Sequence, residues 1–204
     1  KLVLLDDYFP LMKNQRGINY FAFASLGNNI KEIWLNLIEK AYAKVKGSYE
    51  KIQDGNIKDV FDLLTNAPVE KIELCSLERN ALFNIVNEAF NNKFILCGKA
   101  NNNTCYDNGI MKRQHYQILQ MKIFNVGVVR KYMLVIKNIF GELKYNYNWS
   151  ERIPSLKNNK ITDENTFYIS LDDFLKYFSV LYILHIHPIE NEFNFPDAVT
   201  VIGD

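Results

Sequence analysis

The stretch 114–149 reads QHYQILQMKIFNVGVVRKYMLVIKNIFGELKYNYNW. Two apolar runs rich in β-branched residues flank a short break at Val126 and Gly127, which is typical of a β-hairpin. If the chain reverses at this break, His115 lies directly opposite Asn138. Directly opposed side chains share one face of a sheet, with Cβ atoms about 4.5–5.5 Å apart. We therefore expect an imidazole and a carboxamide to be neighbours at the open end of a hairpin.

This pair has the geometry that a protease with a Cys, His and Asn triad needs for its last two members. The amide oxygen can accept the imidazole N–H and fix the ring tautomer, while the other ring nitrogen faces a thiol. His115 and Asn138 are also ordinary residues at strand ends, because both tolerate turn geometry and solvent. The spacing alone leaves both interpretations open.

The bulk composition excludes several classes of protein. The 204 residues carry 24 basic and 23 acidic side chains, a net charge of +1, spread along the chain rather than gathered in blocks. This distribution does not indicate a nucleic-acid partner, and no apolar run is long enough for a transmembrane segment. The three cysteines form no CxxC pair and no disulfide framework, which predicts a reducing, intracellular (cytoplasmic) location.

The hydrophobic periodicity predicts helices in the first half of the chain and mainly strands in the second. Expected helices span 30–45, ended by Gly47, then 57–64, 77–90 and a segment capped by Ser170 with Asp173 three residues on; expected strands span 1–9, 20–24, 94–97 and 180–186. The break at 66–68 separates two parts. The order favours an α+β fold.

A family resemblance runs along nearly the whole chain. EIWLNLIEKAYAKVKGSYE, residues 32–50, resembles the signature that ends the first lobe of calpain-family proteases. Further matches follow in the family's order: LLDDYFP (4–10), FILCG (94–98), KNIFGE (137–142) and FYISLDDFLKYF (167–178). The resemblance implies a papain-like cysteine protease fold, with an antiparallel β-rich second lobe preceded by helices. It also implies three regions: the end of the first lobe (1–66), the second lobe (67–190) and the start of a linker or following domain (191–204).

The resemblance assigns His115 and Asn138 as the catalytic His and Asn of an intracellular, calcium-dependent cysteine-type endopeptidase that performs limited proteolysis of protein or peptide substrates. The family's nucleophilic Cys stands upstream of Lys1, and none of Cys75, Cys97 and Cys105 occupies its position. We read the chain as a piece cut from a larger polypeptide. Its partner would be the upstream first-lobe segment that carries the Cys, and the fragment alone is expected to be inactive.

Calcium is the cofactor that the resemblance implies. Glu32 matches a ligand position in the first lobe, and Glu151 and Glu164 match positions in the second. Lys144 and Thr166, however, stand where the family has carboxylates. Calcium takes six to eight oxygen ligands, and an ammonium group repels it, so we expect the second-lobe site to be weak or empty.

Two alternatives remain. Gln114, Ile139 and Phe140 depart from the family's residues around the site, which motivates a catalytically inactive calpain-like domain with a regulatory or protein-binding role. An unrelated β-rich binding module is the other. His185 and His187 alternate on the last strand and could bind a metal, but two histidines at a strand end more often have no ligand role.

Overall fold

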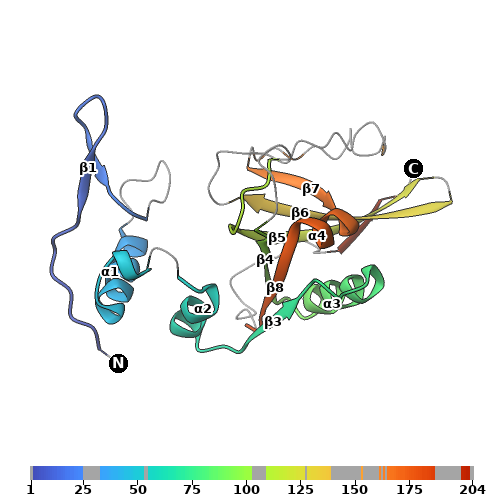
Figure 1. Ribbon diagram of the computed structural model, residues 1–204, viewed down its shortest axis with the longest axis horizontal. Helices are drawn as coiled ribbons and strands as arrows, with labels where there is room; N and C mark the ends of the chain where they lie inside the picture. The colour runs from blue at the N-terminus through green and yellow to red at the C-terminus, as the bar shows by residue number, and fades with distance from the viewer. Residues whose placement is uncertain are drawn as a thin grey trace. The chain divides into compact units, whose positions relative to one another are not determined.

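The computed structural model describes residues 2–24, 33–52, 55–102, 109–126, 128–138, 153, 161, 163, 165–186 and 199–202, the last four through their backbone only. The chain divides into two compact units, Lys1–Val60 and Phe61–Asp204 (Figure 1). The predicted boundaries at residues 66 and 190 stay predictions.

The first unit contains a small hairpin and a helix. Strand β1 (Leu11–Lys13) pairs antiparallel with β2 (Asn19–Phe21), which confirms part of the strand expected at 20–24. Helix α1 (Trp34–Lys46) has Gly47 at its C-cap with φ 108°, and the Gly47 N–H donates to the carbonyl of Ala43 (2.8 Å). Glycine enters this left-handed region without a Cβ clash, so the predicted helix stop is confirmed. A short 3-10 helix, η1 (Glu50–Ile52), follows.

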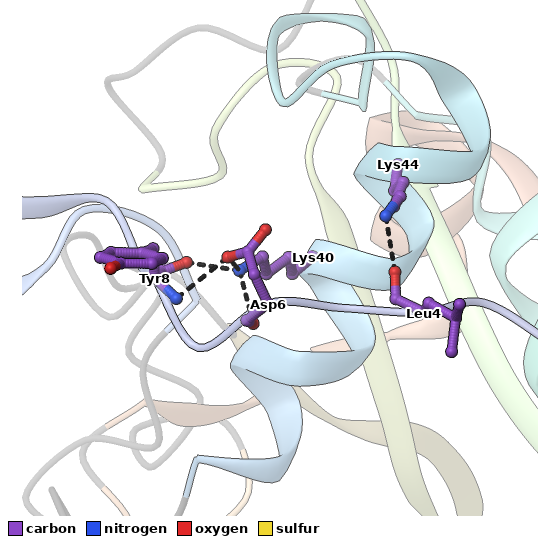
Figure 2. Close-up of polar contacts among 5 residues, drawn as sticks. All are labelled: Leu4, Asp6, Tyr8, Lys40 and Lys44. Atoms are coloured by element: carbon purple, nitrogen blue, oxygen red, sulfur yellow. Dashed lines mark hydrogen bonds and ion pairs between the residues drawn. The ribbon is translucent and has the colours of Figure 1, made fainter.

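The strand expected at 1–9 is wrong, because residues 2–10 pair with no strand. Instead, lysines of α1 bind this extended segment (Figure 2). Lys40 Nζ donates to the carbonyls of Asp6 (2.8 Å) and Tyr8 (2.5 Å) and pairs with the Asp6 carboxylate, and Lys44 Nζ donates to the carbonyl of Leu4 (2.6 Å). Lys40 and Lys44 are four residues apart in the helix, which corresponds to a rise of about 6 Å. Alternate residues of an extended chain are roughly 6.6 Å apart, so the two lysines reach carbonyls two residues apart, those of Asp6 and Leu4.

The second unit is built on a mainly antiparallel sheet. Its strands follow the order β3 (Val69–Glu73), β8 (Phe178–Leu184), β4 (Ile95–Ala100), β5 (His115–Val126), β6 (Val129–Asn138) and β7 (Thr166–Ser170). Strand β9 (Val199–Ile202) adds to β5 in parallel. The sequence analysis did not predict β3, because three of the five residues of this edge strand are charged and exposed.

Helices of the second unit bury their apolar sides in the core of the sheet. α3 (Arg79–Asn91) contributes Leu82, Val86, Ala89 and Phe90, and α4 (Leu171–Tyr177) contributes Leu171 and Phe174. The Asp173 N–H donates to Ser170 Oγ (3.0 Å), which confirms the predicted cap. Helix α2 (Ile57–Thr65), which begins in the first unit, ends in the second and has no buried residue, also matches its prediction. The described residues therefore form the expected α+β arrangement.

Gly98 in β4 provides a test of this packing. A Cβ built at Gly98 would lie 2.8 Å from Phe174 Cζ and 2.9 Å from Phe178 Cδ1, whose stacked rings have centroids 4.3 Å apart. We expect Gly98→Ala to lower the free energy of unfolding by about 1–3 kcal/mol, because both rings must shift. Urea denaturation monitored by circular dichroism measures this effect.

The double variant Gly98→Ala/Phe174→Leu serves as the control for that prediction. A smaller side chain at residue 174 should relieve part of the clash, so the two single losses should sum to more than the loss in the double variant. Strict additivity would contradict the packing explanation.

Candidate active site in the second unit

His115 and Asn138 both lie at the open end of the β5–β6 hairpin, but they are not direct partners. The last β5–β6 pair is Tyr116 with Asn138, and His115 pairs on its other side with Lys99 of β4. The predicted direct pairing of His115 with Asn138 is therefore wrong by one residue. His115 lies just beyond the end of the β5–β6 pairing.

Two opposing features of the hairpin produce this offset. The innermost pair is Val126 with Val129, so the reversal lies one residue later than the sequence suggested, which by itself would displace the partner of His115 by two residues. The register then shifts back by one between Ile118 and Gln120, as at a β-bulge, where one strand carries an extra residue, and a net offset of one residue remains. Neither feature has a strong signal in the sequence, because no Asn-Gly or Asp-Gly turn pair marks the reversal.

The residue that does face Asn138 in the register is a core aromatic. Tyr116 is fully buried, with its ring edge-on to Phe167 and Phe178, and its hydroxyl accepts a hydrogen bond from the Met111 N–H (2.8 Å). Successive strand residues point to opposite faces of a sheet, so Tyr116 and His115 differ in direction. Asn138, as the strand partner of Tyr116, shares the face of the tyrosine and not that of His115, so the predicted shared face of His115 and Asn138 is wrong. The tyrosine side chain ties the strand entry to the core and leaves the imidazole near its surface.

The imidazole of His115 is partly buried, and its surroundings disfavour the protonated, positively charged form. Burial lowers the pKa of His115 below its usual value of 6.5, and the neighbouring Lys99 ammonium lowers this pKa further. The Nε2 atom is buried and has no hydrogen-bond partner in the part of the chain that the structure describes. The ring is therefore neutral near pH 7, the form in which a histidine can accept a proton.

Asn138 is held firmly by its backbone. The residue is only 1% exposed, and its N–H donates to the carbonyl of Asn165 (2.8 Å) in the segment that enters β7. A carboxamide at a strand end can fix the orientation of an imidazole only when the two groups meet, and His115 lies one residue beyond the strand partner of Asn138. The residues that hold this end of β6, Lys137 and Asp163, were missed by the sequence analysis. The sequence Asp-x-Asn at 163–165 could have predicted this turn, because an aspartate side chain commonly accepts a hydrogen bond from the backbone N–H two residues further on.

Neither described cysteine is a candidate nucleophile for this imidazole. Burial raises the pKa of the Cys97 thiol to about 12, so it stays protonated at neutral pH. Cys75 is free and exposed, two residues after the end of edge strand β3, whereas His115 lies in β5. Cys105 lies outside the described residues.

The three proposed calcium ligands, Glu32, Glu151 and Glu164, also lie outside the described residues, as does Lys144. Within the described ranges, no three His, Cys, Asp or Glu side chains gather to hold a metal ion. The described residues beside the second-lobe positions do not suit calcium: the Thr166 hydroxyl donates to Asp163 Oδ2 (3.1 Å), and the Lys137 ammonium contacts the same oxygen (2.8 Å).

His185 has structural partners that account for it. Its Nε2 lies 3.2 Å from Glu70 Oε2, its ring packs on Phe94 with centroids 4.5 Å apart, and its N–H donates to the carbonyl of Pro68 (3.0 Å). His187 lies outside the described residues. These contacts connect β3 to the end of β8 and support the structural interpretation of His185.

This α+β architecture, with a neutral imidazole at a hairpin end and a buried carboxamide on the next strand, fits the second lobe of a papain-like cysteine protease. Comparison with known families agrees: the model of the calpain family cysteine proteases matches residues 1–185. The chain belongs to the calpain family.

Individual calpains resemble the chain over nearly its full length. Human calpain-14 is 24% identical over 91% of the chain, Arabidopsis thaliana calpain-type cysteine protease DEK1 is 27% identical over 94%, and the Gallus gallus calpain-2 catalytic subunit is 26% identical over 91%. The chain spans only 28%, 9% and 28% of these three proteins. The family assignment confirms the papain-like cysteine protease fold class. No helix among the described residues has the length and apolar character to cross a membrane.

The titration of His115 tests the electrostatics of the site. We expect NMR of the 204-residue chain to give His115 a pKa below 6.5, and Lys99→Met to raise this pKa while burial still keeps it below 6.5. Because the unfolded histidine binds its proton at higher pH than the folded one, this group should contribute a loss of stability as the pH falls below 6.5. Lys131→Met, on β6, should leave the pKa unchanged, and a His115 pKa above 6.5 would contradict the burial.

The reactivity of Cys97 tests whether this chain carries its own nucleophile. At pH 8 only about one Cys97 thiol in ten thousand should be ionised, so iodoacetamide should label Cys75 rapidly and Cys97 only after unfolding in urea. Peptide mapping by mass spectrometry separates these two sites from each other and from Cys105, and the variant Cys75→Ser removes the faster of the two. Equal labelling of both cysteines in the folded chain would show that Cys97 is accessible and reactive.

Proposed function

We propose that this chain supplies the His and Asn half of the active site of an intracellular cysteine-type endopeptidase. The carrying observation is the half-buried His115 at the hairpin end, with its Nε2 lacking a partner among described atoms and Asn138 buried on the adjacent strand. The nucleophilic thiol would come from the first lobe, in a segment upstream of Lys1. We assign 1–66 to the end of that lobe and 67–190 to the second lobe.

In the proposed reaction His115 acts first as a base and then as an acid. The imidazole takes the thiol proton, and the thiolate attacks the carbonyl carbon of the scissile peptide bond. The imidazolium then gives its proton to the leaving amine, so that the C–N bond breaks and an acyl-enzyme forms. His115 then takes a proton from water as the water oxygen attacks the thioester carbon, and it returns that proton to the sulfur as the C–S bond breaks, which releases the carboxylic acid and restores the thiol.

Asn138 would orient the imidazole through its amide oxygen. Because Asn138 shares the sheet face of its partner Tyr116 and His115 lies one residue beyond that pair, this contact would have to form around the open end of the hairpin when the site assembles. A fixed carboxamide at that point favours one ring tautomer and leaves the other nitrogen for the thiol. The substrate would be an extended protein or peptide segment.

The 204-residue chain alone should not hydrolyse peptides. The pKa of about 12 at Cys97 supports this expectation, because a protonated buried thiol is a poor nucleophile. Any calcium requirement of the intact protein is assigned to the first lobe, where Glu32 matches a ligand position, since the described surroundings of Thr166 suit an ion pair better than a metal.

A catalytically inactive calpain-like domain with a regulatory or protein-binding role is the second candidate. The observation that favours it is the same register offset, since Tyr116 rather than His115 is the strand partner of Asn138. The residue at the family's Cys position in the intact protein separates the candidates: a cysteine preceding a helix supports the enzyme, and Ser or Gly supports the inactive domain.

The decisive experiment measures cleavage of a fluorogenic peptide by the full-length gene product, with and without calcium. We expect His115→Ala to lower kcat by at least about a thousandfold and Asn138→Ala by about a hundredfold, because the first removes the base and the second only its orientation. His185→Ala, matched in residue type but bound to Glu70, should keep kcat. Equal rates for wild type and His115→Ala would refute the proposed catalytic role.

A further inference from the structure

A compact polar cluster surrounds the carboxylate of Asp163, just before β7. The Asn165 N–H donates to Asp163 Oδ1 (3.0 Å), the Thr166 hydroxyl donates to Oδ2 (3.1 Å), and the Lys137 ammonium lies 2.8 Å from Oδ2. The Thr166 N–H also donates to the Asp163 carbonyl (3.1 Å). One carboxylate thus gathers three donors, two from its own turn and one from the neighbouring strand.

This turn is joined to the end of β6 on both sides of the Lys137–Asn138 peptide. Lys137 is the strand partner of Thr166 in the β6–β7 pairing. One residue further, the Asn138 N–H donates to the carbonyl of Asn165 (2.8 Å). Any movement of the turn therefore moves the backbone of Asn138.

The cation that neutralises this turn is part of the chain. A metal ion at Asp163 Oδ2 would have to displace the Lys137 ammonium that already contacts this oxygen. The Thr166 hydroxyl donates its hydrogen bond to the same atom. Calcium sites need several carboxylate or carbonyl oxygens at once, and the described residues here supply one carboxylate. The lysine performs the charge balance that a bound cation would otherwise provide.

We propose that Asp163 and Lys137 are positioning residues that lock the end of β6 and so hold Asn138 in place without a bound metal ion. The catalytic importance of this lock, the contacts of Asp163 with Lys137 and its own turn, rests on the proposed function. The contacts themselves do not depend on that proposal. The ion pair is about 41% exposed on each side, so alone it contributes little to global stability. Its effect is local, because it restrains one turn and one strand end.

Amide hydrogen exchange of the 204-residue chain, measured by NMR, tests the lock. We expect Asp163→Ala to speed exchange at the Asn138 N–H by about tenfold, because three donors lose their acceptor, and Lys137→Met by about twofold to fivefold. Lys137→Arg keeps the positive charge and should retain the slow wild-type exchange rate at the Asn138 N–H. The Leu134 N–H, in the middle of β6, should exchange at the wild-type rate in every variant, which separates local release from global unfolding.

Two controls make the assignment specific. Lys131→Met, on the same strand, should leave exchange at Asn138 unchanged. The double variant Lys137→Met/Asp163→Ala should exchange at Asn138 no faster than Asp163→Ala alone, because both substitutions remove the same Lys137–Asp163 ion pair. Additive effects, or equal acceleration at Asn138 and Leu134, would overturn the proposal.

Calcium provides the last arm of the test. Addition of calcium chloride at millimolar concentration should change neither the exchange rate nor the chemical shift of Asn138 in the wild-type chain. Slower exchange with calcium would overturn the metal-free lock, whatever the intact enzyme does. Conversely, an inactive full-length protein with an intact lock would refute the proposed function and leave this inference standing.

Discussion

The pairing of β5 with β6 is the constraint on which the rest of the second unit depends. It places Tyr116 in the core opposite Asn138 and leaves His115 just past the last pair, where the ring is half-buried beside Lys99. The one-residue shift between Ile118 and Gln120 decides which side chain faces which. Because strand side chains alternate between faces, a shift of one residue changes every neighbour relationship beyond it.

Charge is handled in this unit by the chain's own side chains. Burial and then Lys99 lower the pKa of His115 and favour the neutral imidazole, and Lys137 beside Asp163 holds the pKa of that carboxyl at about 2. One contact favours the form of histidine that accepts protons, and the other keeps a carboxylate ionised as an anchor for donors. Lys99 lies on β4 opposite His115, and Lys137 lies on β6 opposite Thr166, so the sheet register determines both effects.

Much of the fold was predictable because it depends on local patterns. The helix at 57–64, the stop at Gly47, the Ser170 cap and the hairpin runs all follow from periodicity, glycine conformation and side-chain capping, which act within a few residues. The extended segment before β1 was misjudged, because its partners are lysines more than thirty residues away rather than a strand. The edge strand β3 was missed because its exposed charged residues leave no alternation of apolar and polar side chains.

From the sequence by itself came the family resemblance, the α+β class and the choice of His115 and Asn138, since residue identity and order are written in the chain. Only the tertiary structure decided that these two residues are offset by one pair, and that Lys137 and Asp163 meet. The physical reason is that register depends on the sum of all pairings in a sheet, and residues 26 positions apart in the chain become neighbours only when the strands assemble.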